Sequence, residues 1–482
     1  MVYTGFTHYD RQLTTVVAQV NDPNAAWQNQ EPHWILIEDL VGGTYELRRR
    51  HRRYLPQEPR ELDESYDNRL ARSTCPPYYQ RLERMLAGML TRKPVRLNDV
   101  SDIVREQLFN VDLQGNDLNV WTYETARKMV RYGHVGVLVD APAAGENGRP
   151  YWCSYTPREI LGWRTELMDG AQKLTQLRLL EKVIVPDGLY GEKQVEQIRV
   201  LTPGAFELHR RDSKGAFEVF DEGTTSMDHI PFSVAYSNRV NFMESRPPLE
   251  DIAELNLKAY QVQSDLDNQL HISAVPMLAF FGFPASAEEV SAGPGEAISF
   301  PAEGRAEYIE PDGKSFEAQF RRLEQIAHQI NELGLSAVLG QKLSAETAEA
   351  KRIDRSQGDS TMMVIAQNMQ DLIDNCLAYH AEYLNITEVG SSYVNRDFLG
   401  TRLEPAEIQS LLALYTAGTI TQKTLLDQLY EGEVLGDDFD VEEEVEATQN
   451  GGLIDMAPPE QQMMNAIPEY SSDLEDIDVI PS

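Results

Sequence analysis

The sequence predicts an α+β fold in which helical segments flank a central block of strands. Apolar residues recur at the spacing of a helix before residue 133 and again after residue 246. Between them, residues 151–234 form short β-rich runs separated by turn sequences such as "PDG" and "DSKG", which are typical of antiparallel hairpins. A chain of 482 residues with 41% hydrophobic content is long enough to bury a sizeable core.

The segment before residue 151 predicts three helical pieces and a buried strand. Residues 63–90 form two of the helices, separated by the Pro76–Pro77 pair. The third runs through about Arg131, where Gly133 ends it, and the apolar run "VGVLVD" that follows predicts a buried strand.

Two long helices with narrow apolar stripes follow the β region. The first spans residues 246–276, and the second spans residues 315–333. Residues 277–314 between them are rich in Gly and Pro and show no helical period. The expected stripes consist of Ile252, Leu255, Ala259, Val262, Leu266 and Leu270 in the first helix, and of Phe316, Phe320, Leu323, Ala327, Ile330 and Leu333 in the second.

The C-terminal part of the chain predicts further helices and an acidic tail. After a break at "ELGLSAVLGQKLSAET", a long helix runs from about Ala345 to Tyr383. Two shorter helices are expected on either side of Gly418, with Thr421 as the N-cap of the second. Residues 431–482 contain 16 acidic residues and no Lys or Arg, so this composition predicts a mostly disordered tail.

The overall charge and the cysteines limit the classes of function. A formal net charge of −34 argues against tight wrapping of DNA, since affinity for phosphates comes from cations. Such a protein can still let DNA pass close by. Three scattered cysteines, together with an N-terminus that lacks a signal pattern, predict a reducing, cytoplasmic place of assembly and no disulfide framework.

No motif of an enzyme is found. The sequence has no P-loop, no nucleophile elbow and no zinc-binding His-Glu-x-x-His, so no catalytic residue, cofactor or metal is expected. The "HAE" of residues 380–382 is interpreted as part of an ordinary helix. Asp140, after the buried strand, is the one candidate for a metal-dependent nuclease, and no acidic partner for it is evident.

A dense basic run stands out near the N-terminus. Within "LRRRHRRYLP", five arginines are candidates for a contact: Arg48, Arg49, Arg50, Arg52 and Arg53. They are interpreted mainly as partners of carboxylates, within the subunit or across an interface, and DNA phosphates are the alternative.

Several stretches resemble one known family. They include "SYDNRLARS", "LAGMLTRKP", "GHVGVLVDAP", "IPFSVAYSN", the helix beginning "RPPLEDIAELNLKAY" and "ETAEAKRIDRSQGDSTMMVIAQNMQ". In order and spacing they are similar, over residues 45–430, to the portal proteins of tailed bacteriophages, in a branch described as a domain of unknown function.

The resemblance implies a ring, of twelve copies in the family, at one vertex of the capsid in the virion. Its channel would pass double-stranded DNA during packaging and ejection. The implied partners are the major capsid protein, a scaffolding protein, the terminase and a head–tail adaptor or neck protein, with no membrane.

The resemblance also implies a division of the chain. Residues 1–245 and 347–400 would form the wing, 246–276 and 315–333 the stem, 277–314 the clip, 334–346 the tunnel loop, 401–430 the crown and 431–482 the tail. Within the tunnel loop, Gly334 and Gly340 would supply mobility, and Gln341 and Lys342 would face DNA, although Lys342 is equally well read as an ordinary solvent-facing lysine. The alternatives are another ring-forming neck or adaptor protein and the nuclease.

Overall fold

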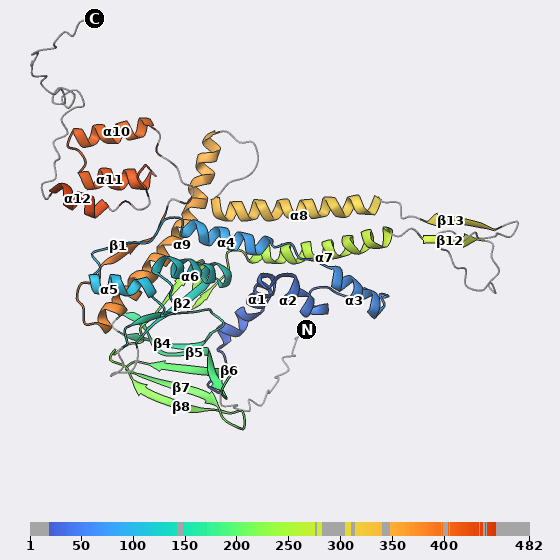
Figure 1. The fold of residues 1–482 in the computed structure, drawn as a ribbon, viewed down its shortest axis with the longest axis horizontal. Helices are drawn as coiled ribbons and strands as arrows, with labels where there is room; N and C mark the ends of the chain where they lie inside the picture. Colours follow the sequence, from blue (N-terminus) through green and yellow to red (C-terminus); the bar gives the residue numbers. More distant parts are fainter. Residues whose placement is uncertain are drawn as a thin grey trace, which may run out of the picture. The chain divides into compact units, whose positions relative to one another are not determined.

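The computed structural model describes residues 19–141, 148–168, 170–274, 277–281, 304–309, 314–339, 348–396, 398, 403, 405–432, 434–436, 439 and 441–449 (Figure 1). The chain divides into two compact units, Met1–Phe398 and Leu399–Ser482. The first unit combines helices with antiparallel sheets, which confirms the α+β class.

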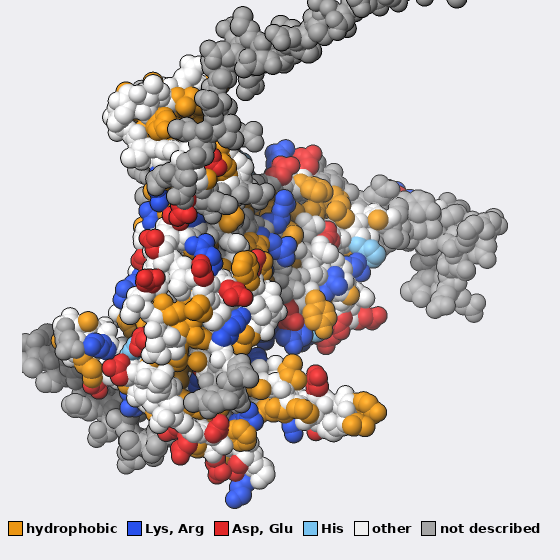
Figure 2. Space-filling view, turned by 60° about the vertical axis from the view of Figure 1, so that its left-hand side comes forward, with side chains coloured by type: hydrophobic (Ala, Val, Ile, Leu, Met, Phe, Trp, Pro, Cys, Tyr) orange, Lys and Arg blue, Asp and Glu red, His pale blue; other side chains and the backbone are white. Residues whose placement is uncertain are grey.

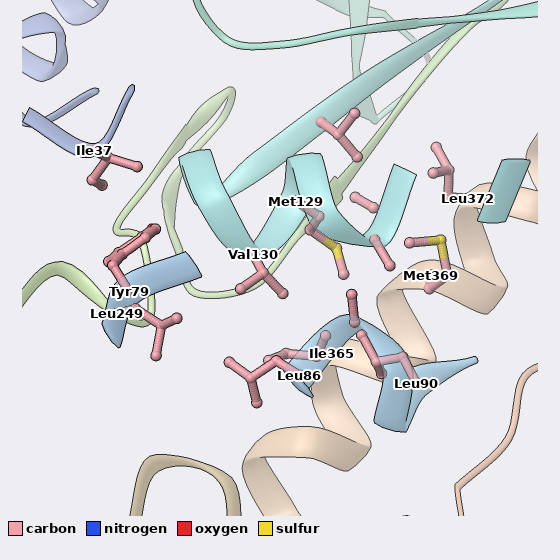
Figure 3. Packing of buried hydrophobic residues seen from close by; sticks show 14 of the residues in the cluster. Ile37, Tyr79, Leu86, Leu90, Met129, Val130, Leu249, Ile365, Met369 and Leu372 are labelled. Atoms are coloured by element: carbon pink, nitrogen blue, oxygen red, sulfur yellow. The ribbon is translucent and has the colours of Figure 1, made fainter. Parts of the chain in front are cut away.

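Helices from distant parts of the chain meet in one hydrophobic core. Apolar residues of α4 and α6 recur three or four positions apart, so each helix buries one continuous face. The C-terminal half of α9 completes the core through Ile365, Met369 and Leu372, which lie beside Leu90 and Met129 (Figure 3). The helices of this region are α1 (Ala25–Val41), α2 (Gly43–Arg49), α3 (Asp63–Arg72), α4 (Tyr78–Leu90), α5 (Asp102–Gln107), α6 (Leu118–Tyr132) and α9 (Ala348–Tyr383), with the short 3₁₀ turns η1 (His51–Arg53) and η2 (Leu108–Asn110).

A three-stranded sheet packs against this helical core. The central strand β2 (His134–Asp140) pairs with β3 (Tyr151–Tyr155) on one side and with β9 (Phe232–Tyr236) on the other. The chain turns from α6 into β2 at Gly133, whose φ of +91° is a conformation that side chains disfavour. The predicted helix end and buried strand are therefore confirmed.

A five-stranded antiparallel sheet is formed by the residues between β3 and β9, and its strand order follows the sequence. The turn "DSKG" closes its last hairpin, because the carboxylate of Asp212 accepts hydrogen bonds from the backbone N–H groups of Lys214 (2.9 Å) and Ala216 (2.8 Å). The strands are β4 (Ile160–Met168), β5 (Ala171–Asp187), β6 (Gly191–Thr202), β7 (Ala205–Arg211) and β8 (Phe217–Thr224).

Two long helices, α7 (Glu250–Ser273) and α8 (Lys314–Leu339), lie side by side (Figure 1). The antiparallel strands β12 (Met277–Phe281) and β13 (Arg305–Ile309) follow α7 and precede α8. Two small strand pairs complete the unit: β1 (Arg96–Asn98) with β14 (Ser391–Tyr393), and β10 (Arg239–Asn241) with β11 (Glu244–Ser245).

The expected break at Gly334 is wrong, because α8 continues through this residue to Leu339. Gly334 is buried against α4, where a Cβ would lie 2.9 Å from Cδ1 of Leu82. The glycine therefore allows a close helix approach, at a cost in helix propensity of about 1 kcal/mol. Gly340, Gln341 and Lys342 lie outside the described residues.

The first unit also buries polar groups that have partners. The carboxylate of Glu83 on α4 accepts hydrogen bonds from Arg127 (3.1 Å) and Arg131 (2.7 Å) of α6. Burial lowers the pKa of His134 to about 3, and its Nδ1 lies 2.9 Å from Oγ of Ser245. These contacts join α4 to α6 and β2 to β11.

The second unit contains α10 (Pro405–Thr416), α11 (Gln422–Glu431) and α12 (Val441–Gln449). Gly418 has a φ of +69° and Thr421 caps α11, as predicted. Helix α12 lies within the segment from residue 431 that was predicted to be mostly disordered, so Val441–Gln449 depart from that prediction, which stays a prediction for the rest of the segment. Val441 is buried and Val445 follows one turn later, so even this acidic stretch has an apolar stripe. Residues 450–482 lie outside the described part of the chain.

Candidate functional site

The basic run lies on α2 and η1, and its central arginines are engaged inside the first unit. Arg48 donates two hydrogen bonds, of 3.0 and 2.6 Å, to the backbone carbonyl of Ser73. Arg50 donates from Nε to the buried carboxylate of Asp39 at 3.0 Å, and the hydroxyl of Tyr54 donates to the same carboxylate at 2.6 Å. The hydrogen bond to Asp39 raises the pKa of Arg50.

The outer arginines of the run also have partners. Arg49 pairs with Glu46 at 2.7 Å, and Arg52 pairs with Asp63 at 3.0 Å. The guanidinium of Arg53 lies over the ring of Tyr54, 5.5 Å from its centroid. These contacts favour the interpretation that the run pairs with groups of its own chain. A contact of these arginines with another subunit or a partner stays a prediction.

The inner half of α7 buries Ile252, Ala259 and Leu266 of the predicted stripe, and its core face also includes polar positions. Asn256, Tyr260 and Ser264 are buried, whereas Leu255 and Val262 are only half-buried. The side chain of Asn256 accepts a hydrogen bond from the backbone N–H of Tyr79 (2.9 Å) and donates one to the carbonyl of Pro76 (2.9 Å). Tertiary partners thus make polar positions part of the core face.

The outer half of the helix pair has no core of its own. Among the described side chains of residues 267–273 and 316–325, none is buried. Apolar side chains nevertheless remain there, and Leu270, Ile272 and Phe320 are exposed. Phe281 on β12, just beyond α7, is exposed as well. We call this set of four residues the outer apolar face; in a single chain it is left in water.

The geometry does not favour the nuclease alternative. Asp140 accepts hydrogen bonds from Arg199 (2.9 Å) and from the hydroxyl of Tyr151 (3.1 Å), so its charge is already paired. Within the described residues, no group of three or more His, Cys, Asp and Glu side chains is placed to hold a metal ion.

The "HAE" segment belongs to the core. His380 is buried on α9, where Nδ1 accepts a hydrogen bond from the indole of Trp152 (3.2 Å) and Nε2 lies 2.8 Å from Gln107. Burial lowers the pKa of this imidazole to about 4. Its interpretation as part of an ordinary helix agrees with this packing.

No helix in the described part of the chain is long and apolar enough to cross a membrane.

Comparison with known proteins gives one family and several structures. Residues 248–384, less than a third of the chain, match a family described as a domain of unknown function, DUF4055. This segment covers α7, β12, β13, α8 and α9. No match is found among curated proteins.

Three similar solved structures come from gene transfer agent (GTA) particles. One is a chain from the neck of an empty GTA particle, with 13% identity and a TM-score of 0.39 over 74% of this chain and 90% of that one. A second is from the neck of a native particle (12% identity, TM-score 0.38, covering 77% and 93%). The third is from the virion of a native particle (11%, 0.37, covering 72% and 88%). TM-scores at this level support no functional argument.

Proposed function

We propose that this chain is a structural protein of a phage-like virion, and within that class a portal protein. Copies would form a ring at one capsid vertex, and DNA would pass through its channel during packaging and ejection. The observation that carries the proposal is the outer half of the α7–α8 pair, which presents the outer apolar face and buries no described side chain of its own.

A helical hairpin of this kind needs a partner surface. Isolated helices are marginal in water, and most of their stability in proteins comes from packing an apolar face. Leu270, Ile272 and Phe320 can be covered if the same helices of neighbouring copies stand beside them. When one surface of each copy contacts a different surface of the next, and the rotation closes, the product is a ring.

The charge of the helix pair suits a conduit for DNA. Cations that neutralise phosphates would hold DNA in place, since affinity rises with the number of such contacts. Helix α7 has one lysine, Lys258, against five carboxylates: Glu250, Asp251, Glu254, Asp265 and Asp267. Figure 2 shows positive and negative side chains interspersed over the face that it presents, without a broad basic patch.

The assignment of residue ranges to the parts of a portal protein follows the family resemblance. Residues 1–245 and 347–400 form the wing, the α7–α8 pair is the stem, 277–314 the clip and 401–430 the crown. Terminase and neck proteins dock at the clip. The tunnel loop then begins after Leu339 rather than at Gly334, because α8 extends that far.

The test is the mass and shape of the purified full-length chain in solution. Twelve chains of 54.6 kDa give a particle of about 655 kDa, visible by mass photometry and as a ring with a central hole in negative-stain images. A compact dimer without a hole would overturn the proposal. Incubation with plasmid DNA and Mg²⁺ separates the nuclease alternative: a portal leaves the plasmid intact, whereas cleavage that is lost in Asp140→Ala would identify the enzyme.

A further inference from the structure

The β5–β6 hairpin extends beyond the rest of its sheet. Strand β4 pairs with β5 only as far as Leu179, and β7 pairs with β6 from Gln197 onward. The last five pairs of the hairpin, from Val183↔Val195 to Asp187↔Gly191, have no strand neighbour on either side among the described residues. At about 3.3 Å per residue they project about 16 Å.

The tip of this hairpin carries two apolar side chains. Gly188, with a φ of +77°, allows the tight turn. Leu189 and Tyr190 follow it and are 84% and 95% exposed. Hairpin turns usually hold Gly, Asn and Asp, because these residues tolerate positive φ angles and the Asn and Asp side chains hydrogen-bond to the local backbone. Tyrosine is instead enriched in protein interfaces, so this pair indicates a surface that is covered in an assembly.

A groove of about 700 Å³ lies at the opposite end of β5. The volume falls within the roughly 300–1,000 Å³ of pockets that bury drug-sized ligands, so it has room for two side chains. Its apolar part comes from β9 and the following turn, and α9 closes one side. Its lining includes Thr175 of β5, Phe232 of β9, Phe242 between β10 and β11, and Tyr379 of α9.

The hairpin tip and the groove carry opposite net charges. The projecting part of the hairpin, residues 183–195, holds two carboxylates, Asp187 and Glu192, and one lysine, Lys193, which is a net charge of −1. The groove is lined by two cations, Lys173 and Arg239, with Asp228 as the one carboxylate among its lining residues. An acidic tip is therefore attracted to a groove of net positive charge.

We propose that the Leu189–Tyr190 tip of each copy inserts into this groove of the next copy around the ring. The inference rests on the proposed ring. Thr175 lies 12 residues before the end of β5 at Asp187, which is about 40 Å along the strand, and Tyr190 lies in the turn beyond, so a copy cannot fill its own groove. Each copy offers one tip and one groove, and closing the ring fills every groove.

Cross-linking of a double variant, Thr175→Cys with Tyr190→Cys, tests this contact in the full-length chain. A short bis-maleimide can join the two positions only between copies. Burial raises the pKa of Cys75 and Cys153 to about 12 and that of Cys376 still further, so the native thiols react slowly. The matched control pairs Thr175→Cys with Lys214→Cys, which is exposed in the neighbouring hairpin turn.

The expected result is a ladder of covalent multimers in denaturing gels for the first variant and only monomer for the control. Rings that are intact in images but remain monomeric in the gel would overturn the tip–groove contact and leave the ring proposal standing. Multimers from Tyr190→Cys alone would show tip-to-tip contact and also overturn it. If no ring forms at any concentration, both proposals fall.

A second variant measures the energetic role of the tip. Leu189→Ser with Tyr190→Ser is expected to shift ring assembly to at least tenfold higher protein concentration without changing the melting temperature of the monomer. Val219→Ser, at an exposed apolar position on β8 of the same sheet, is the control and should leave assembly unchanged. Unchanged assembly of the tip variant would contradict the proposal.

Discussion

Replacing two residues of the outer apolar face, Ile272→Ser and Phe320→Ser, should weaken the ring without unfolding the chain. The two side chains are 59% and 48% exposed in the single chain. Fully burying an Ile or Phe side chain contributes about 1.5–3 kcal/mol, and about half of each remains to be buried, so each contributes about 1 kcal/mol to a subunit contact. The double variant should therefore raise the subunit dissociation constant roughly thirtyfold.

The assay is the concentration at which half of the chains are assembled, followed by mass photometry or sedimentation. Ile103→Ser is the matched control, because Ile103 on α5 is 57% exposed and lies far from the helix pair in the sequence. Its assembly midpoint should not move. The melting temperature of all the monomers should be similar, since surface substitutions usually change stability by less than about 0.5 kcal/mol. An assembly midpoint of the double variant equal to that of the natural chain would refute the role of the outer apolar face.

Three further predictions concern the fold and can be checked by urea unfolding. Glu83→Gln removes the carboxylate partner of Arg131 and leaves Arg127 paired with the exposed Glu124, and it should cost about 3 kcal/mol. Glu124→Gln, at an exposed carboxylate, should cost less than about 1 kcal/mol; equal losses would contradict this. Gly133→Ala should lower the free energy of unfolding, because φ is positive there and a Cβ would lie 2.9 Å from the carbonyl carbon of Arg246. Gly88→Ala is the control: a Cβ meets open space in α4, so this variant should raise the free energy of unfolding by up to about 1 kcal/mol. Burial lowers the pKa of His134 to about 3, whereas an unfolded histidine has a pKa near 6.5. The unfolded state therefore binds the proton first, and the free energy of unfolding should fall as the pH drops from 6.5 toward 3. If the free energy of unfolding of His134→Gln fell with pH just as steeply, His134 would not be the cause.

Local signals predicted much of the helical core. The periodic apolar residues of α4, the Pro76–Pro77 break and the left-handed Gly133 each act over a few residues, so the sequence shows them directly. The same holds for the hydroxyl of Thr421, which caps α11 by accepting a hydrogen bond from the backbone N–H of Thr424. Such features need no knowledge of what packs against them.

The N-terminal helix α1 was not predicted, although the sequence contains a signal. Trp27, Trp34 and Val41 recur every seven residues, which is two helical turns, and both tryptophans are buried. Pro32 inside the helix obscures the pattern, because proline usually ends a helix. Here the packing of the tryptophans outweighs the lost hydrogen bond.

Features made by distant residues could not be predicted from spacing. The core face of α7 includes Asn256, whose partners are the backbone groups of Tyr79 and Pro76, far away in the sequence. The groove beside Tyr379 likewise joins strands and a helix that lie more than two hundred residues apart. The basic run was partly interpretable, since an acidic chain supplies many carboxylates, but only the fold shows that Asp39 is the partner of Arg50.

The five-stranded sheet enters the chain between β3 and β9, the two strands that flank β2. The sheet is attached to β3 at Tyr155 and to β9 at Phe232. Each of these strands is paired with β2, so the two attachment points are separated by about 10 Å, twice the spacing of paired strands. The inserted sheet is also tied to β2 by side chains, because Leu177 and Leu201 pack in one cluster with Leu138, and Arg199 pairs with Asp140 at 2.9 Å. In mechanical terms, a force that displaces the five-stranded sheet is passed to β2, and through β2 to the helical core, by these contacts.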